Sequence, residues 1–185
     1  INNVYGGNDI SGKVYGGNAV GVYTSIRGDL YGGGNGSYPY TDNPALKDDP
    51  TYSDLYYGDF MQAKGFTSSV EALNAFRPNA EAVSIRLIGA SAASQTIIGG
   101  SLYCGGNSAT LRNDNPKADA AAELKIGSYV VVDKAFLGNN GANMIDESIL
   151  QKYAGNVNGV DFSQMDLTDE SQFATYMDGV TMRVM

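Results

Sequence analysis

A short repeated frame constrains the fold of this chain more than any other feature of its sequence. The frame is I-x-G-x-[VL]-Y-x-G-[GN], and it occurs in three full copies, one degraded copy and one truncated copy. These copies are residues 10–18, 26–35 and 98–107, then residues 131–139 and 1–8. A unit of this length cannot bury its own apolar side chains, so such repeats become stable only by stacking on one another.

Each copy alternates apolar with small or polar residues, which is the period expected of a half-buried β-strand. The residues that follow the copies are mostly Asn, Gly and Asp, which tolerate the left-handed conformations of tight corners. A weaker strand-like element precedes several copies, at residues 19–23, 83–89 and 124–127. Stacked strands about 4.8 Å apart would pair their backbone groups and share one core. We therefore expect an all-β fold, a parallel β-helix (solenoid) fragment with loop insertions and a short helical excursion near the C-terminus.

An antiparallel all-β fold, either a β-sandwich or a β-propeller, is the alternative architecture. It would show Asn-Gly or Asp-Gly turns between strands of matched length. Here the strands are followed by Gly-Gly-Asn corners, and the spacing between copies is unequal. Tyr31 and Tyr103 are 72 residues apart, whereas Tyr103 and Phe136 are 33 residues apart. Insertions on one face of a coil would explain this spacing, so the pattern favours the solenoid.

The domain organisation follows from the positions of the copies. We predict coils over residues 1–143, with insertions at about 37–81 and 112–121. Residues 144–185 are expected to form a helical excursion that returns to a strand of the same solenoid. The strand-like residues at both ends of the chain indicate a fragment whose partners include the remainder of a longer chain.

Local signals predict single elements and roles within this plan. Residues 69–76 predict a short helix, with Ser69 as its cap and Pro78 shortly after its end. Cys104 stands at a corner position and is expected to act as a small hydrophobe. A stacked structural ladder is expected of the tyrosines that share one frame position, which are Tyr5, Tyr15, Tyr31 and Tyr103.

Composition narrows the possible chemistry. Among 185 residues there are no His and one Cys, with 12 Lys and Arg against 20 Asp and Glu. Without His, the Ser-His-Asp and Cys-His relays and His-ligated zinc are excluded, and one Cys allows no intrachain disulfide. The net charge of −8 argues against nucleic-acid binding, and no run of 18 apolar residues predicts a membrane span. We expect no catalytic residues, no metal and no cofactor. Ca²⁺ in the insertion is left open as an alternative, but no loop motif supports it.

The first insertion holds the residues that best suit binding. Its tyrosines lie among aspartates, and three prolines interrupt regular structure there. Aromatic rings stack on the C–H faces of sugars and carboxylates accept hydrogen bonds from hydroxyls, so this set suits carbohydrate recognition. The competing interpretation is that the tyrosines pack the insertion onto the strands while the acids are solvated. The predicted binding residues are Tyr38, Tyr40, Tyr52, Tyr56, Tyr57, Asp48, Asp49 and Asp54.

The Val-Tyr-Gly-Gly-Asn and Leu-Tyr-Gly-Gly-Gly-Asn units resemble the tandem VYGGGN repeats of very large secreted surface proteins of Gram-negative gut anaerobes. The resemblance rests on residues 4–8, 14–18, 29–35 and 101–107, with a looser match over 124–140. Those proteins are described as adhesin-like or hemagglutinin-like. The resemblance implies a right-handed parallel β-helix and an extracellular or bacterial cell-surface location, and it supplies no catalytic residues.

These observations lead to one expected function and two alternatives. We expect a non-enzymatic structural and adhesive segment of a large bacterial cell-surface protein, a rigid stalk that presents loops to glycans or proteins of a host or neighbouring cell. One alternative is a carbohydrate-active β-helix, a polysaccharide lyase or glycoside hydrolase, that uses acidic residues of the 42–59 insertion. Such chemistry needs two carboxylates about 5 to 10 Å apart. The other alternative is a glycan-binding module without catalysis.

Overall fold

The strands of the chain are short and pair in parallel. The structure is a computed structural model, and it describes residues 1–111, 121–141 and 183–184. Every pairing between its named strands is parallel. The strands are β1 (Val4–Tyr5), β2 (Lys13–Val14), β3 (Asn18–Val22), β4 (Leu30–Tyr31), β5 (Asn79–Ala80), β6 (Ala82–Leu87), β7 (Thr96–Tyr103), β8 (Thr110–Leu111), β9 (Ala121–Ile126), β10 (Val130–Phe136) and β11 (Arg183–Val184).

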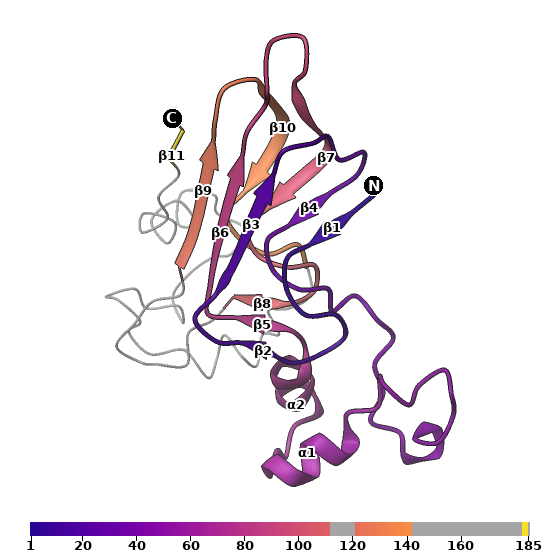
Figure 1. Ribbon diagram of the computed structural model, residues 1–185. Coiled ribbons are helices and arrows are strands. Elements are labelled where there is room, and N and C mark those ends of the chain that lie inside the picture. The colour runs from indigo at the N-terminus through magenta and orange to yellow at the C-terminus, as the bar shows by residue number, and fades with distance from the viewer. Residues whose placement is uncertain (112–120, 142–182, 185) are drawn as a thin grey trace, which may run out of the picture. The chain divides into compact units, whose positions relative to one another are not determined.

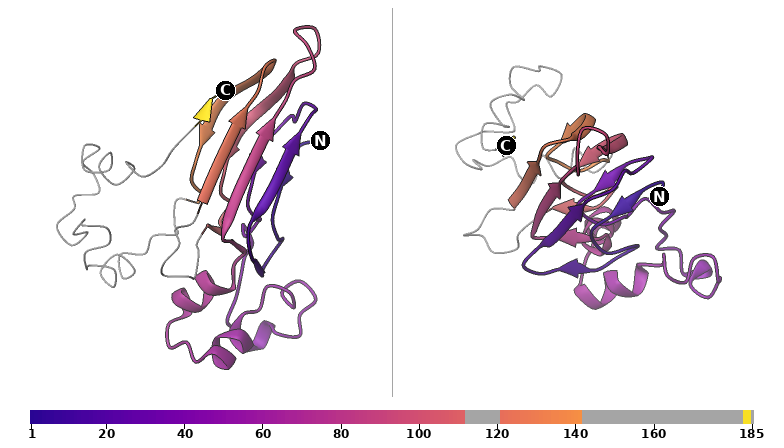
Figure 2. Two further views of the ribbon diagram at one scale, coloured as in Figure 1. Left: turned by 60° about the vertical axis from the view of Figure 1, so that its left-hand side comes forward. Right: turned by 45° about the horizontal axis from the view of Figure 1, so that its top comes forward.

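These strands form three small sheets (Figure 1). The first has the order β1-β4-β7-β10, the second β11-β9-β6-β3 and the third β2-β5-β8. From β1 to β10 the chain visits the first, the third and the second sheet in turn, so each visit adds one strand. Figure 2 shows the resulting row of β9, β6 and β3, which run side by side in the same direction.

Four copies of the repeated frame meet in the first sheet. Val4 pairs with Leu30 and Leu30 with Leu102, while Tyr5 pairs with Tyr31 and Tyr31 with Tyr103. Strand β10 continues the row because Phe136 pairs with Tyr103. The copy at 10–18 differs, since its strand β2 lies in the third sheet and pairs with β5. Equivalent positions of neighbouring copies are therefore paired only in the first sheet.

The predicted fold class, an all-β right-handed parallel β-helix (solenoid), is wrong. The described residues form a mixed α/β structure in which the three small parallel sheets are combined with helices α1 (Gly58–Lys64) and α2 (Ser69–Phe76), and no solenoid is shown. A 3-10 turn, η1 (Pro44–Leu46), belongs to the same insertion. The repeat signal misled the prediction for a physical reason. Many strands are only two residues long, so the repeated frame forms only short strand pairings. The insertion between the copies forms helices, which the frame does not predict.

Both helices have local causes. The bounds of α2 match the prediction, but its cap is Ser68, whose side chain accepts a hydrogen bond from the Glu71 amide at 3.4 Å. Helix α1 was missed because it is a single short run that begins at a glycine. It ends at Gly65, which has a φ of 71° and donates to carbonyls of the last turn. Figure 1 shows α2 next to β2, an edge strand of the third sheet, with α1 beyond α2.

The core gathers apolar side chains from strands of all three sheets. Leu30, Ile85 and Leu102 have no exposed surface, and Leu124 of β9 has 1%. Cys104 is fully buried among them, as expected of a small hydrophobe. The predicted helices of the 144–185 segment and most of the predicted 112–121 insertion lie outside the described residues. From that C-terminal part only β11 is described, and it pairs with Lys125 and Ile126 of β9.

Candidate functional site

Stacked aromatic rings run across the first sheet. The ring centroids of Tyr5 and Tyr31 are 4.9 Å apart, those of Tyr31 and Tyr103 5.1 Å, and those of Tyr103 and Phe136 4.9 Å. The planes differ by 5°, 6° and 14°, so the rings lie face over face. The predicted ladder is confirmed for these tyrosines. Tyr15 was expected there too, but it is 77% exposed and lies under the Lys13 ammonium instead.

A ladder of amide side chains runs beside the rings. Asn140 donates to Asn107, Asn107 to Asn35, and Asn35 to Asp9, each at 3.1 Å. All of these donors point toward Asp9, whose carboxylate can only accept and therefore ends the series. The same carboxylate accepts the hydroxyl of Tyr38 at 2.5 Å, and this hydrogen bond raises the pKa of Tyr38 above its ordinary value.

The Tyr31 hydroxyl joins the two ladders. It donates to Asp29 at 3.1 Å and accepts from Asn140 at 3.2 Å. Burial, together with the Asp29 charge, raises the pKa of Tyr31 to about 12. The backbone beside it leaves no room for a side chain, because a Cβ on Gly32 would lie 2.3 Å from Val83. The same residues thus recur in successive copies of the frame because the copies contact one another across neighbouring strands.

Three of the predicted binding tyrosines are held by contacts within the molecule. Tyr40 stands edge-on to Phe76 with centroids 6.0 Å apart, and its hydroxyl donates to the carbonyl of Ile10. Burial raises the pKa of Tyr40 to about 12. Tyr57 is 5% exposed and lies 6.2 Å from Phe76, and Tyr38 is held by Asp9. For these three residues the packing interpretation describes what the structure shows.

A loop over residues 42–55 carries the other predicted residues. Its ends meet where the Thr41 amide donates to Leu55 at 3.1 Å and the Tyr57 amide donates to Thr41 at 3.0 Å. Tyr52, Tyr56 and Asp49 are half-buried, whereas Asp48 and Asp54 are exposed.

The accessible side of this loop also carries a cation. The Lys47 ammonium lies 2.7 Å from Asp59 and 5.9 Å from the centre of the Tyr56 ring. The hydrogen bond to Asp59 raises the pKa of Lys47 above its ordinary value. Both partners of this ion pair are exposed to solvent, which limits its contribution to stability. Lys47 was not among the predicted binding residues, although it directly precedes Asp48, which was.

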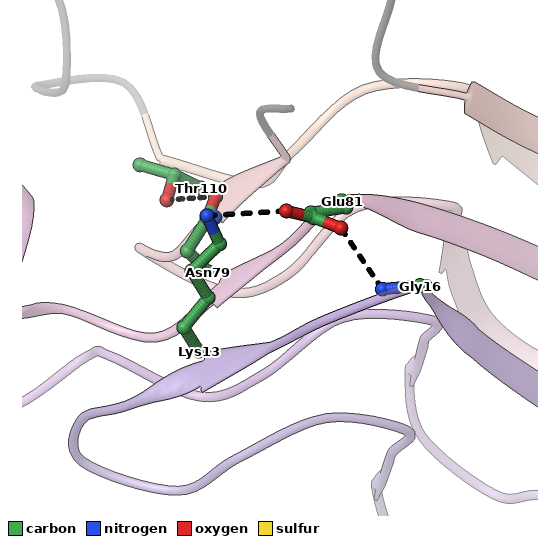
Figure 3. Close-up of polar contacts among 5 residues, drawn as sticks. All are labelled: Lys13, Gly16, Asn79, Glu81 and Thr110. Atoms are coloured by element: carbon green, nitrogen blue, oxygen red, sulfur yellow. Dashed lines mark hydrogen bonds and ion pairs between the residues drawn. The ribbon is translucent and has the colours of Figure 1, made fainter. Parts of the chain in front are cut away.

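A second polar cluster lies on the third sheet, and sequence reasoning missed it (Figure 3). The Lys13 ammonium of β2 lies 3.2 Å from Glu81, and the Gly16 amide donates to the other carboxylate oxygen at 2.9 Å. The Thr110 hydroxyl of β8 donates to the Asn79 side chain at 2.7 Å. Residues 13, 79 and 110 come together only through the pairing β2-β5-β8. Lys13 stands at a variable position of the repeated frame, so the frame gave no signal for it.

Neither a metal cluster nor a membrane helix is found in the described ranges. Within residues 1–111, 121–141 and 183–184, no three His, Cys, Asp or Glu residues lie close enough together to hold a metal ion. In the same part of the chain, no helix has the length and apolar character needed to cross a membrane. Comparison with protein-family models, curated proteins and solved structures finds no match to the chain.

Proposed function

We propose that this chain is a non-enzymatic structural and adhesive segment of a bacterial cell-surface protein. The observation that carries the proposal is the pair of ladders, in which aromatic rings stack on aromatic rings in successive strands and amides bond to amides just beyond them. Side chains used in this way are committed to contacts within the molecule. The repeated part thus suits a rigid scaffold, and the cell-surface location rests on the resemblance of the repeated Tyr-Gly-Gly units.

The contact surface in this proposal is the 42–55 loop with the adjoining Tyr56. Tyr52 and Tyr56 provide partly accessible rings, while Asp48 and Asp54 provide exposed carboxylates. Rings of this kind cover the apolar faces of sugars, and carboxylates accept hydrogen bonds from sugar hydroxyls. The loop is closed at its base by backbone hydrogen bonds of Thr41, which hold it on the scaffold. We therefore propose glycans as the ligands of this loop.

The test is a loop replacement that spares the base of the insertion. Residues 44–54 are exchanged for a short Gly-Ser linker, so that the bonds of Thr41 to Leu55 and Tyr57 stay possible. Two finer variants are Tyr52→Ala and Tyr56→Ala, and the matched control is Tyr23→Ala, because Tyr23 is a tyrosine 69% exposed outside the insertion. Circular dichroism checks that each variant is folded.

Binding is measured on a glycan array. We expect the wild type and Tyr23→Ala to bind the same glycans, and the loop replacement to bind none. Binding that survives the loop replacement, or its absence in the wild type, would contradict the adhesive part of the proposal. The non-enzymatic part is tested with the same glycans in solution. Release of new reducing or unsaturated ends that stops in an Asp54→Asn variant would overturn it.

A further inference from the structure

The polar cluster of the third sheet places an amine opposite a carboxamide. Lys13 and Asn79 are directly opposite each other in the parallel pair of β2 and β5. Paired residues of adjacent parallel strands project their side chains from the same face, about 4.8 Å apart at the backbone. An amine and a carboxamide are thus held as neighbours by backbone pairing rather than by chance contact of long side chains.

A carboxylate stands beside the amine. Glu81 follows Asn79 by two residues, between β5 and β6, and Figure 3 shows its carboxylate directed at the Lys13 ammonium. The distance between the Lys13 Nζ and the Glu81 Oε1 is 3.2 Å, and the Gly16 amide holds Oε2 at 2.9 Å. The side chains of Lys13 and Glu81 are only 19% and 20% exposed. Partial removal of water lessens the preference for the charged pair over the neutral amine and acid that the attack requires.

A hydrogen-bond donor stands on the carboxamide oxygen. Thr110 of β8 pairs with Asn79 on the side opposite to Lys13. Its hydroxyl donates to the Asn79 Oδ1 at 2.7 Å and lies 3.3 Å from the Pro78 carbonyl. A donor on this oxygen polarises the carbonyl carbon and stabilises the negative charge that develops on the oxygen during attack by a nucleophile.

We propose that Lys13 and Asn79 form an amide cross-link between β2 and β5, with Glu81 carrying the protons. Glu81 takes a proton from the Lys13 ammonium, and the neutral Nζ attacks the Asn79 Cγ to form a carbon–nitrogen bond. The charge on Oδ1 is held by Thr110. Glu81 passes the protons from Nζ to Nδ2, the bond between Cγ and Nδ2 breaks, and ammonium leaves. Two protons leave Nζ and both depart on the ammonium, so Glu81 ends as a carboxylate and no further reactant is required.

The chemistry of this site is set by the three residue types together. Lysine supplies a nucleophile once it is deprotonated, and a neighbouring carboxylate is what removes its proton. An ordinary ion pair between Lys13 and Glu81 would need no carboxamide directly opposite the lysine. It would also need no donor on the carboxamide oxygen. The proposal goes beyond the proposed function and does not rest on it.

The test is the intact mass of the full chain. The cross-linked protein is lighter than the unmodified sequence by about 17 Da, the mass of one ammonia. We expect this loss in the wild type and its absence in Lys13→Arg, which keeps a cation beside Glu81, and in Glu81→Gln. Thr110→Val is expected to lower the linked fraction at early times after synthesis. The matched control is Lys125→Arg, because Lys125 also forms a 2.7 Å ion pair with a glutamate, Glu123, but within one strand.

Peptide mapping assigns the loss of mass to a bond. Proteolysis of the wild type should yield one branched peptide that joins the segments around residues 13 and 79. Because a succinimide formed at an Asn-Gly pair loses the same mass, the digest is also treated with hydroxylamine, which opens a succinimide and leaves an amide intact. An unshifted wild-type mass would overturn the proposal. So would a loss of ammonia that maps elsewhere or persists in both Lys13→Arg and Glu81→Gln.

Discussion

Replacing Tyr31 by leucine tests whether the aromatic ladder stabilises the fold. Tyr31 is 3% exposed and lies between two rings, with centroids 4.9 Å from Tyr5 and 5.1 Å from Tyr103. A stacked aromatic pair contributes about 0.5–1.5 kcal/mol beyond area burial, so two pairs contribute about 1–3 kcal/mol. The hydroxyl makes two hydrogen bonds, to Asp29 and from Asn140, which together contribute about 1–3 kcal/mol.

The expected costs therefore differ in steps along one series of variants. Tyr31→Leu should lower the free energy of unfolding by about 2–6 kcal/mol, because both stacked pairs and both hydrogen bonds are lost. Tyr31→Phe keeps the stack and should cost about 1–3 kcal/mol. Tyr5→Leu removes one stacked pair and should cost about 0.5–1.5 kcal/mol. Tyr15→Leu should have almost no effect, because Tyr15 is 77% exposed and outside the stack.

The assay is urea unfolding followed by circular dichroism, with the slope against denaturant checked for each variant. An unchanged slope shows that a shift of the midpoint reports stability alone. The order expected is Tyr31→Leu, then Tyr31→Phe and Tyr5→Leu, then Tyr15→Leu. If Tyr31→Leu costs no more than Tyr5→Leu, ring stacking and the hydroxyl bonds do not stabilise the chain, and the reasoning from the ladder is refuted.

Three further predictions follow from titration, thiol chemistry and the cross-link. Burial raises the pKa of Tyr31 and Tyr40 to about 12 in the folded chain, against an ordinary value of 10.0, so the unfolded chain loses these protons first. Urea unfolding at a series of pH values should show a free energy of unfolding that falls as the pH rises from about 10 to 12. Burial also raises the pKa of Cys104 to about 11, so a thiol reagent should label it only in denaturant, and rapid labelling of the native chain would contradict its place in the core. A cross-link that closes the chain between residues 13 and 79 stabilises by about 4 kcal/mol in the chain-entropy estimate, so Lys13→Arg should unfold at lower urea concentration than Lys125→Arg.

Several features of the fold could be predicted because their signals are local. The repeated frame predicted which segments lie together, since Val4 pairs with Leu30 and Leu30 pairs with Leu102. The run from Ser69 to Phe76 predicted α2 with its observed bounds, because capping and apolar spacing act within a few residues of the helix. The burial of Cys104 followed from its corner position in the frame.

Other features depend on contacts between distant segments. The all-β prediction was wrong because it treated residues 37–81 as a loop insertion on the strands. Helix α1 and the rings around Phe76 give this insertion a structure of its own. Tyr15 shares its frame position with Tyr31, yet its copy pairs in the third sheet and leaves the ring exposed. The sequence around Tyr57 is rich in acidic residues and predicts an exposed ring. In the structure this ring is buried and packs against Phe76.

The sequence alone determined the residue types that this molecule can use and the short segments that repeat. Periodicity, corner glycines and helix caps act over a few residues, so they can be recognised from the sequence alone. Only the tertiary structure decided which side chains meet. Lys13, Asn79 and Thr110 become neighbours because three two-residue strands pair in register across two long intervening segments. That register depends on the packing of the whole core, and no local pattern at these three residues encodes it.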